Sequence, residues 1–197
     1  MNATDKTITS EAISTKSSEG KKFDTKTLVI MALFAALLCV SAYISIPLPN
    51  GSHITALNFV VTIIALVFPL NQSFLISLVW LLIGAVGVPV FIGGGAGVGY
   101  LAGPYGGYSF AFIVIAILLP IVCNRKYNRI YFTVMSILSA VLVDVIGSIW
   151  LMVNSGISVQ AAFVTGFLPF IPLDLVKAVV AAQIVPQLKK ILISDQL

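Results

Sequence analysis

Residues 130–153 read IYFTVMSILSAVLVDVIGSIWLMV, an apolar run interrupted by a single charge, Asp144. A helix of this length crosses the roughly 30 Å hydrocarbon core of a bilayer, because each residue adds about 1.5 Å. The scarcity of charge extends well beyond this run, since only six charged side chains lie between Thr27 and Leu188. Backbone groups in lipid must satisfy their own hydrogen bonds. The sequence therefore predicts an all-α integral membrane protein.

Apolar runs separated by turn-forming residues predict about six transmembrane helices. The predicted spans cover about 26–46, 54–68, 72–88, 108–123, 130–153 and 172–188. They make up one substrate-binding membrane domain, 26–192. Residues 1–25 are rich in Ser, Thr, Lys and Glu, which predicts a disordered cytoplasmic tail. Residues 193–197 form a short C-terminal end on the same side.

Lysine and arginine are distributed unevenly among the connections. They occur before the first span, between the fourth and fifth, and after the sixth, but not in the loops between spans one and two, three and four, or five and six. These basic residues are Lys21, Lys22, Lys26, Arg125, Lys126, Arg129, Lys189 and Lys190. The positive-inside rule then predicts a multi-pass cell-membrane protein with both termini cytoplasmic. The net charge of +4 is thereby explained by membrane anchoring, which argues against nucleic-acid binding.

The three uncharged outer loops, 47–53, 89–107 and 154–171, are apolar and rich in Gly or Pro. External loops are ordinarily polar. Loops of this composition are expected to fold back as re-entrant segments or lids, buried against protein. They predict a ligand pocket near the outer face.

Two charged residues near the start of the last span are the first site candidates. Asp174 and Lys177 are three residues apart, so a helix places them on one face. They either form an ion pair that locks helix packing or serve a pocket, with Lys177 holding a carboxylate and Asp174 accepting from ring N–H groups, or the reverse. Asp144 is either a proton or cation site or a buried carboxylate bonded to Ser or Tyr. Asn154 either terminates its helix or binds ligand.

The glycine-rich stretch before the fourth span does not match a nucleotide-binding loop, because no G-x-x-x-x-G-K-[ST] pattern occurs. Gly94 and Gly95 instead allow a tight turn and close approach to a ligand. Tyr105 and Tyr108 either cover an apolar ring or belong to an interfacial aromatic belt, and Trp80 is open to the same two interpretations.

No catalytic constellation and no metal-ligand spacing is evident, since the chain has one histidine and two widely separated cysteines. The prediction is a non-enzymatic protein without a cofactor or metal. Ala32 and Ala36 form a small-xxx-small pair that allows another helix to approach closely, either within the chain or from a partner.

Three segments share a specific pattern of motifs. They are GVPVFIGGG at 87–95 leading to GPYGGY at 103–108, PFIPLDLVKA at 169–178, and LFAA at 33–36 followed by IPLP at 46–49. Together they resemble the BioY family, the biotin-binding S components of energy-coupling factor (ECF) transporters. The resemblance extends from about Lys26 to Leu192.

That resemblance implies a six-helix subunit that captures biotin near the outer face and delivers it inward. The implied partners are a transmembrane ECF coupling protein and two cytoplasmic ATPases, which alone would use ATP. Asp174 and Lys177 match the polar pair of the family's binding pocket. Ala32 and Ala36 match the alanine pair that docks onto the coupling protein.

The sequence also departs from the family pattern. Tyr105 and Leu173 replace the usual Thr and Gly, and Asn58 is the candidate substitute for a pocket Gln. Lipoate or another carboxylate vitamin therefore stays open as the ligand. A third possibility is an ion-coupled secondary transporter that uses Asp144 and Asp174, and co-purification with ATPases would distinguish it.

Overall fold

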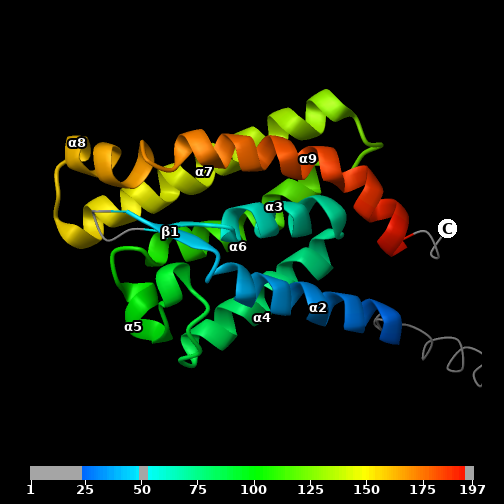
Figure 1. Cartoon of the computed structure of the whole chain (residues 1–197), viewed down its shortest axis with the longest axis horizontal. Helices are drawn as coiled ribbons and strands as arrows, with labels where there is room; N and C mark the ends of the chain where they lie inside the picture. The colour runs from blue at the N-terminus through cyan, green and yellow to red at the C-terminus, as the bar shows by residue number, and fades with distance from the viewer. Residues whose placement is uncertain (1–23, 49–52, 194–197) are drawn as a thin grey trace, which may run out of the picture.

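The computed structural model describes residues 24–48 and 53–193, and these form an elongated bundle of helices (Figure 1). The predictions for the N-terminal tail up to residue 23, for Lys21 and Lys22, and for 194–197 lie outside the described residues. The elements, in order, are α2 (Thr25–Ser41), β1 (Ser45–Pro47), β2 (His53–Thr55), α3 (Leu57–Val67), α4 (Leu70–Ala85), η1 (Ile92–Gly94), α5 (Gly97–Ala102), α6 (Gly106–Val122), α7 (Arg129–Ser155), α8 (Val159–Ala162), η2 (Phe163–Phe167) and α9 (Ile171–Ile193).

Each of the six predicted spans contains one long helix, α2, α3, α4, α6, α7 and α9 in turn. The prediction for the first span was wrong at its end, because α2 stops at Ser41 rather than Ile46. The following residues form β1, which pairs antiparallel with β2, with Ile46 opposite Ile54. The apolar character of the run continues, but Pro47 disfavours helical geometry at the residue before it. The backbone is satisfied by strand pairing instead.

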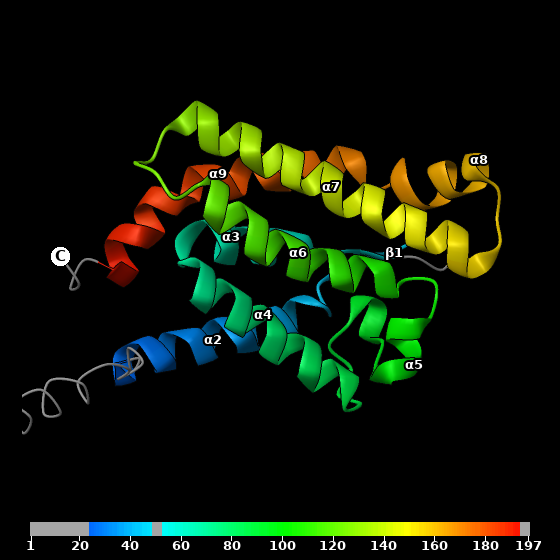
Figure 2. The same ribbon diagram turned by 180° about the vertical axis from the view of Figure 1, so that it is seen from behind.

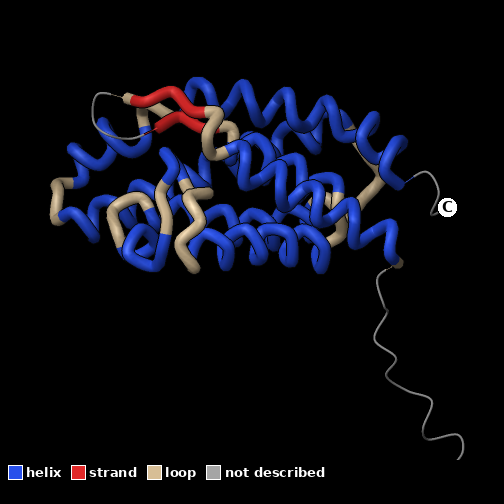
Figure 3. Tube along the Cα trace, turned by 60° about the horizontal axis from the view of Figure 1, so that its bottom comes forward, coloured by secondary structure: helices blue, strands red, loops and turns tan. Residues whose placement is uncertain are grey.

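The outer loops contain short ordered elements. The glycine stretch forms η1 and the two-turn helix α5, and Gly93 and Gly94 adopt φ of 68° and 77°, which few other residues tolerate. The segment after α7 forms α8 and the π-helical turn η2. Figures 1 and 2 place β1, α5 and α8 together at one end of the bundle, and Figure 3 shows both strands there.

Helix α7 packs against both α6 and α9, while α3 lies between α6 and α9. Small residues set the separation of α6 and α7. Gly107 of α6 lies against the Trp150 side chain of α7, and Gly147 of α7 lies against the Tyr108 ring of α6. A reciprocal pair of this kind brings two backbones close together and fixes their register.

Large apolar side chains are exposed along the outside of the bundle, including Leu33 (65%), Ile130 (77%) and Val153 (72%). Two helices, α7 and α9, are long and apolar enough to cross a bilayer, and α2, α3, α4 and α6 are shorter apolar helices. Helix α3 has only 11 residues, or about 16 Å of rise. Its first two residues, Leu57 and Asn58, are buried inside the bundle, and Asn58 is one of the site candidates.

Candidate functional site

A connected polar cluster lies within the otherwise apolar bundle. Asp174 of α9 is 6% exposed. Its Oδ1 pairs with Nζ of Lys177 at 2.7 Å, and its Oδ2 accepts from Nδ2 of Asn58 at 2.8 Å. Nζ of Lys177 also donates to the carbonyl of Thr55 at 2.8 Å. The cluster thus joins α9, the start of α3 and the end of the β-hairpin.

Local sequence explains why these groups meet. Asp174 and Lys177 lie one turn apart on α9, and Asp174 is in the first turn of that helix. A carboxylate is stabilised there by the positive end of the helix dipole. Asn58 is the second residue of α3, and Thr55 ends β2 just before it. Of the two interpretations of Asp174 and Lys177, the ion pair is observed, and its further partners come from segments more than 100 residues away.

Aromatic side chains lie beside the cluster. The hydroxyl of Tyr108, which is 4% exposed, donates to the carbonyl of Gly166. Its ring centroid is 5.7 Å from that of Phe170 and 6.5 Å from that of Tyr105. The carbonyl of Phe170 accepts from the backbone N–H of Asp174 at 3.0 Å, which connects this aromatic pair to the polar cluster. One of the two predicted tyrosines is thus buried next to the polar groups, with an aromatic neighbour that sequence reasoning had not singled out.

Asp144 faces the same region from α7 and is 1% exposed. Its helix packs against α9, which carries Asp174 and Lys177. Its Oδ2 has no hydrogen-bond partner within the described residues. Ser148, one turn along the helix, donates to the backbone carbonyl of Asp144 at 2.6 Å. The hydroxyl of Tyr108 is directed to Gly166. Both interpretations of Asp144, a proton or cation site and a carboxylate bonded to Ser or Tyr, therefore stay predictions.

The remaining candidates make contacts away from the Asp174 cluster. Nδ2 of Asn154 donates to the carbonyl of Ala102 at 2.6 Å, which ties α7 to α5. Trp80 is fully buried, and its indole N–H donates to the carbonyl of Val90 at 2.9 Å. These bonds position the loops that flank the cluster.

The two glycines differ in what surrounds them. A Cβ at Gly94 would meet nothing within 4 Å, whereas one at Gly95 would clash with the Tyr100 ring. Gly94 is needed for its positive φ, and Gly95 for close aromatic packing. Both therefore shape the loop.

Sequence reasoning missed Thr55, because it contributes a backbone carbonyl, which every residue carries. It also left Phe170 without a role, although the residue stands in a quoted motif. No sequence signal distinguishes a ring beside a site from the other buried aromatics of the core.

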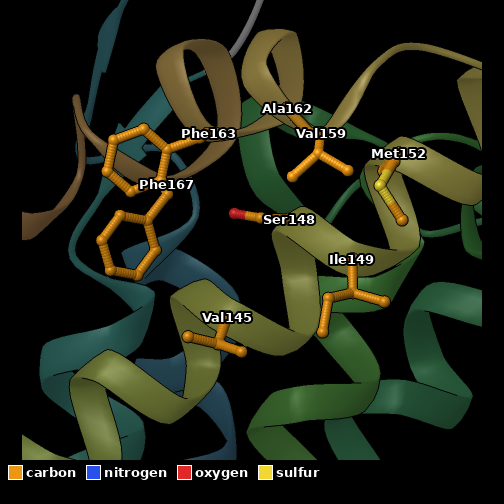
Figure 4. Close-up of a pocket in the computed structure, with 8 residues that line it drawn as sticks. All are labelled: Val145, Ser148, Ile149, Met152, Val159, Ala162, Phe163 and Phe167. Atoms are coloured by element: carbon orange, nitrogen blue, oxygen red, sulfur yellow. The ribbon is translucent and has the colours of Figure 1, made fainter.

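A separate apolar pocket of about 230 Å³ lies between α7 and the segment formed by α8 and η2 (Figure 4). Phe163 and Phe167 stack on one side with ring centroids 5.2 Å apart, and Ile149 and Met152 form the other. Ser148 supplies the one hydroxyl of the lining. None of the residues predicted for the site lines this pocket.

The fold and cluster define an all-α integral membrane protein with a small, mostly buried polar site. A sequence model described as the BioY family matches residues 14–194. The biotin transporter BioY2 of Lactococcus lactis subsp. cremoris is 33% identical over 153 residues, covering 77% of this chain and 84% of that protein. The biotin transporter BioY of Thermotoga maritima is 32% identical over 164 residues, covering 83% and 96%. The chain belongs to the BioY family.

Comparison of structures agrees with that assignment. The crystal structure of the S-component for biotin from an ECF-type ABC transporter matches with a TM-score of 0.74 and 25% identity. The match covers 86% of this chain and 95% of that one. The shared architecture therefore spans nearly the whole bundle.

Proposed function

We propose that this chain is the biotin-binding S component of an ECF transporter, which captures the vitamin near the outer face for ATP-driven delivery inward. The observation that carries the proposal is the Asn58–Asp174–Lys177 cluster beside Tyr108 and Phe170. Ligand sites are mostly apolar with a few well-placed polar groups that fix orientation. The names of the family's relatives supply biotin as the ligand to test.

The cluster has hydrogen-bonding capacity left for a ligand. The Lys177 ammonium carries three protons, of which Asp174 and Thr55 accept two. The third is free to bind a carboxylate or a ring carbonyl. Each oxygen of Asp174 has a second lone pair for a ring N–H. Tyr108 and Phe170 supply apolar surface for the rest of the ligand, and the loops with Gly94, Gly95, Tyr105, Trp80 and Asn154 are proposed to close over it.

The proposed orientation is six spans with both termini cytoplasmic. Figures 1 and 2 support it, because the start of α2, the α6–α7 connection and the end of α9 lie at one end of the bundle. That end carries the described basic residues outside the site: Lys26, Arg125, Lys126, Arg129, Lys189 and Lys190. The hairpin, α5 and α8 lie at the opposite end, which is therefore the outer face.

The proposed docking surface for the transmembrane coupling protein is the outward face of α2. Ala32 and Ala36 are both exposed there, so neither is used for packing within the chain. Their neighbours Leu33 and Leu37 are 65% and 45% exposed. Small residues flanked by large apolar ones suit close helix–helix contact in a membrane. Two cytoplasmic ATPases would complete the complex, and no catalytic role is assigned to this chain.

The first test is titration of the purified, ligand-free protein with biotin, lipoate and dethiobiotin, followed by Trp fluorescence. Lys177→Ala should weaken biotin binding at least tenfold, whereas Lys190→Ala, an exposed lysine on the same helix, is the matched control. Saturable binding of lipoate but not biotin would keep the site and change the ligand. Absence of binding by any of the three, in folded protein, would refute the vitamin assignment.

The second test concerns the partners. Affinity purification from membranes of the native host should recover ATPase subunits with the wild type and lose them with Ala32→Leu/Ala36→Leu. Recovery that is unchanged in this variant would rule out the α2 surface.

A further inference from the structure

The interior of the bundle contains an unbalanced set of charges. Asp144 on α7 and Asp174 and Lys177 on α9 carry two negative charges and one positive charge. Both carboxylate oxygens of Asp174 accept hydrogen bonds, Oδ1 from Lys177 and Oδ2 from Asn58. Asp144 is equally buried, and its Oδ2 has no partner within the described part of the chain. An ionised carboxylate that is buried with one oxygen lacking a donor is costly, and a proton is the simplest way to neutralise it.

A change of charge at Lys177 is expected to affect the protonation of Asp144. Asp144 lies on α7, and α7 packs against α9, the helix that carries Asp174 and Lys177. On α6, the Tyr108 ring lies against Gly147, which is one turn along α7 from Asp144, and its hydroxyl donates to the carbonyl of Gly166. Helix α3 brings the neutral Asn58 to the cluster, and the segment 159–167 contains no charged residue. Lys177 is therefore the one cation that balances two carboxyl groups here among the described residues.

We infer that Asp144 is a proton-binding site that takes up one proton when a monocarboxylate ligand binds at Lys177. The inference rests on the proposed function. The ligand carboxylate occupies the free N–H of Lys177 and adds a third negative charge near a single ammonium. An ionised Asp144 would then be repelled by both Asp174 and the ligand at short range in a low-dielectric interior. One proton from water converts the Asp144 carboxylate to the neutral acid, and no other bond changes.

The sign of the resulting pH dependence follows from linkage. Because the bound state holds more protons than the free state, affinity for the carboxylate falls as pH rises, by up to about tenfold per pH unit. A ligand of the same shape without the carboxylate leaves the charge at Lys177 unchanged. Its binding is expected to involve no proton.

The test is isothermal titration calorimetry of the purified wild-type protein with biotin at one pH, in two buffers of different ionisation enthalpy. The difference in binding heat counts protons, and about one is expected for biotin and none for biotin amide. Asp144→Asn should abolish the uptake and flatten the pH profile. The comparison of biotin with its amide uses the wild type alone, so equal proton uptake with both ligands would overturn the inference even if the variant does not fold.

The outcomes separate the two proposals. Biotin binding without proton uptake, or uptake that persists in Asp144→Asn, would overturn the role of Asp144 and leave the vitamin site intact. No binding of biotin by the wild type at any pH would overturn the proposed function itself.

Discussion

Replacing Gly147 by alanine places one methyl group at the closest approach of α6 and α7. A Cβ at this position would lie 2.5 Å from Cζ of Tyr108 and closer still to Cδ1 and Cε1. Carbon atoms pack best at about 3.5–4.0 Å, so the ring must move by roughly 1 Å. It has little freedom to do so, since Tyr108 is buried between Phe170 and the carbonyl of Gly166.

The expected cost is a loss of ~2–4 kcal/mol in the free energy of unfolding. Overpacking of a core contributes about 1–3 kcal/mol of this, and weakening of the Tyr108–Gly166 hydrogen bond adds about 1 kcal/mol. Displacement of the Tyr108 ring also changes the surface beside Asp174. Biotin affinity is therefore expected to fall by about tenfold, which corresponds to about 1.4 kcal/mol.

The assay is SDS-induced unfolding in mixed micelles, followed by Trp fluorescence, with biotin titration of the folded variant. Gly99→Ala is the matched control, because Gly99 lies in the short helix α5 and a Cβ there would meet nothing within 4 Å. The control should unfold like the wild type or be slightly more stable. Equal stability and equal biotin affinity in Gly147→Ala and Gly99→Ala would show that the α6–α7 contact does not support the site.

Three further predictions concern individual contacts. Asn128→Ala removes the side chain that accepts from the N–H groups of Ile130 and Tyr131 in the first turn of α7, so thermal denaturation should show a loss of about 0.5–2 kcal/mol, and a melting curve like the wild type would contradict the capping role. Trp80→Phe leaves the buried carbonyl of Val90 without its donor and should cost about 1–3 kcal/mol in the same assay; a smaller loss would mean that water replaces the indole. Asp174→Asn should destabilise the protein more than Asp174→Asn/Lys177→Met does, because the single change leaves the partly buried Lys177 ammonium without its ion-pair partner, and the reverse order of unfolding midpoints would argue against this.

The sequence predicted the class of the fold because its apolar composition extends over nearly the whole chain. Long apolar runs with almost no charge cannot face water, and the backbone inside lipid has few alternatives to a helix. The same logic failed between residues 42 and 47, where the chain is equally apolar but forms part of a hairpin. Hydropathy does not distinguish an apolar helix from an apolar strand. Residues 45–47 form a strand because residues 53–55 pair with them.

Only the part of the site formed by residues close together in the sequence could be predicted. Asp174 and Lys177 are one helical turn apart, so their placement on one face of the helix follows from spacing alone. Asn58 was a candidate through the family pattern, but its bond to Asp174 joins positions 116 residues apart. Sequence spacing also could not show whether Asp144 is a proton or cation site or a hydrogen-bonded carboxylate.

The sequence by itself determined a membrane-embedded bundle of helices, its family, and the placement of Asp174 and Lys177 on one face of the last helix, since each of these depends on residues close together in the chain. Tertiary structure decided the rest. Packing of α3 against α9 brought Asn58 and the Thr55 carbonyl to the ion pair. Packing of α7 buried Asp144 beside them without a partner for Oδ2 among the described residues. Burial and hydrogen bonding between distant segments are properties of the assembled bundle, because the chain must fold before those groups lose water together.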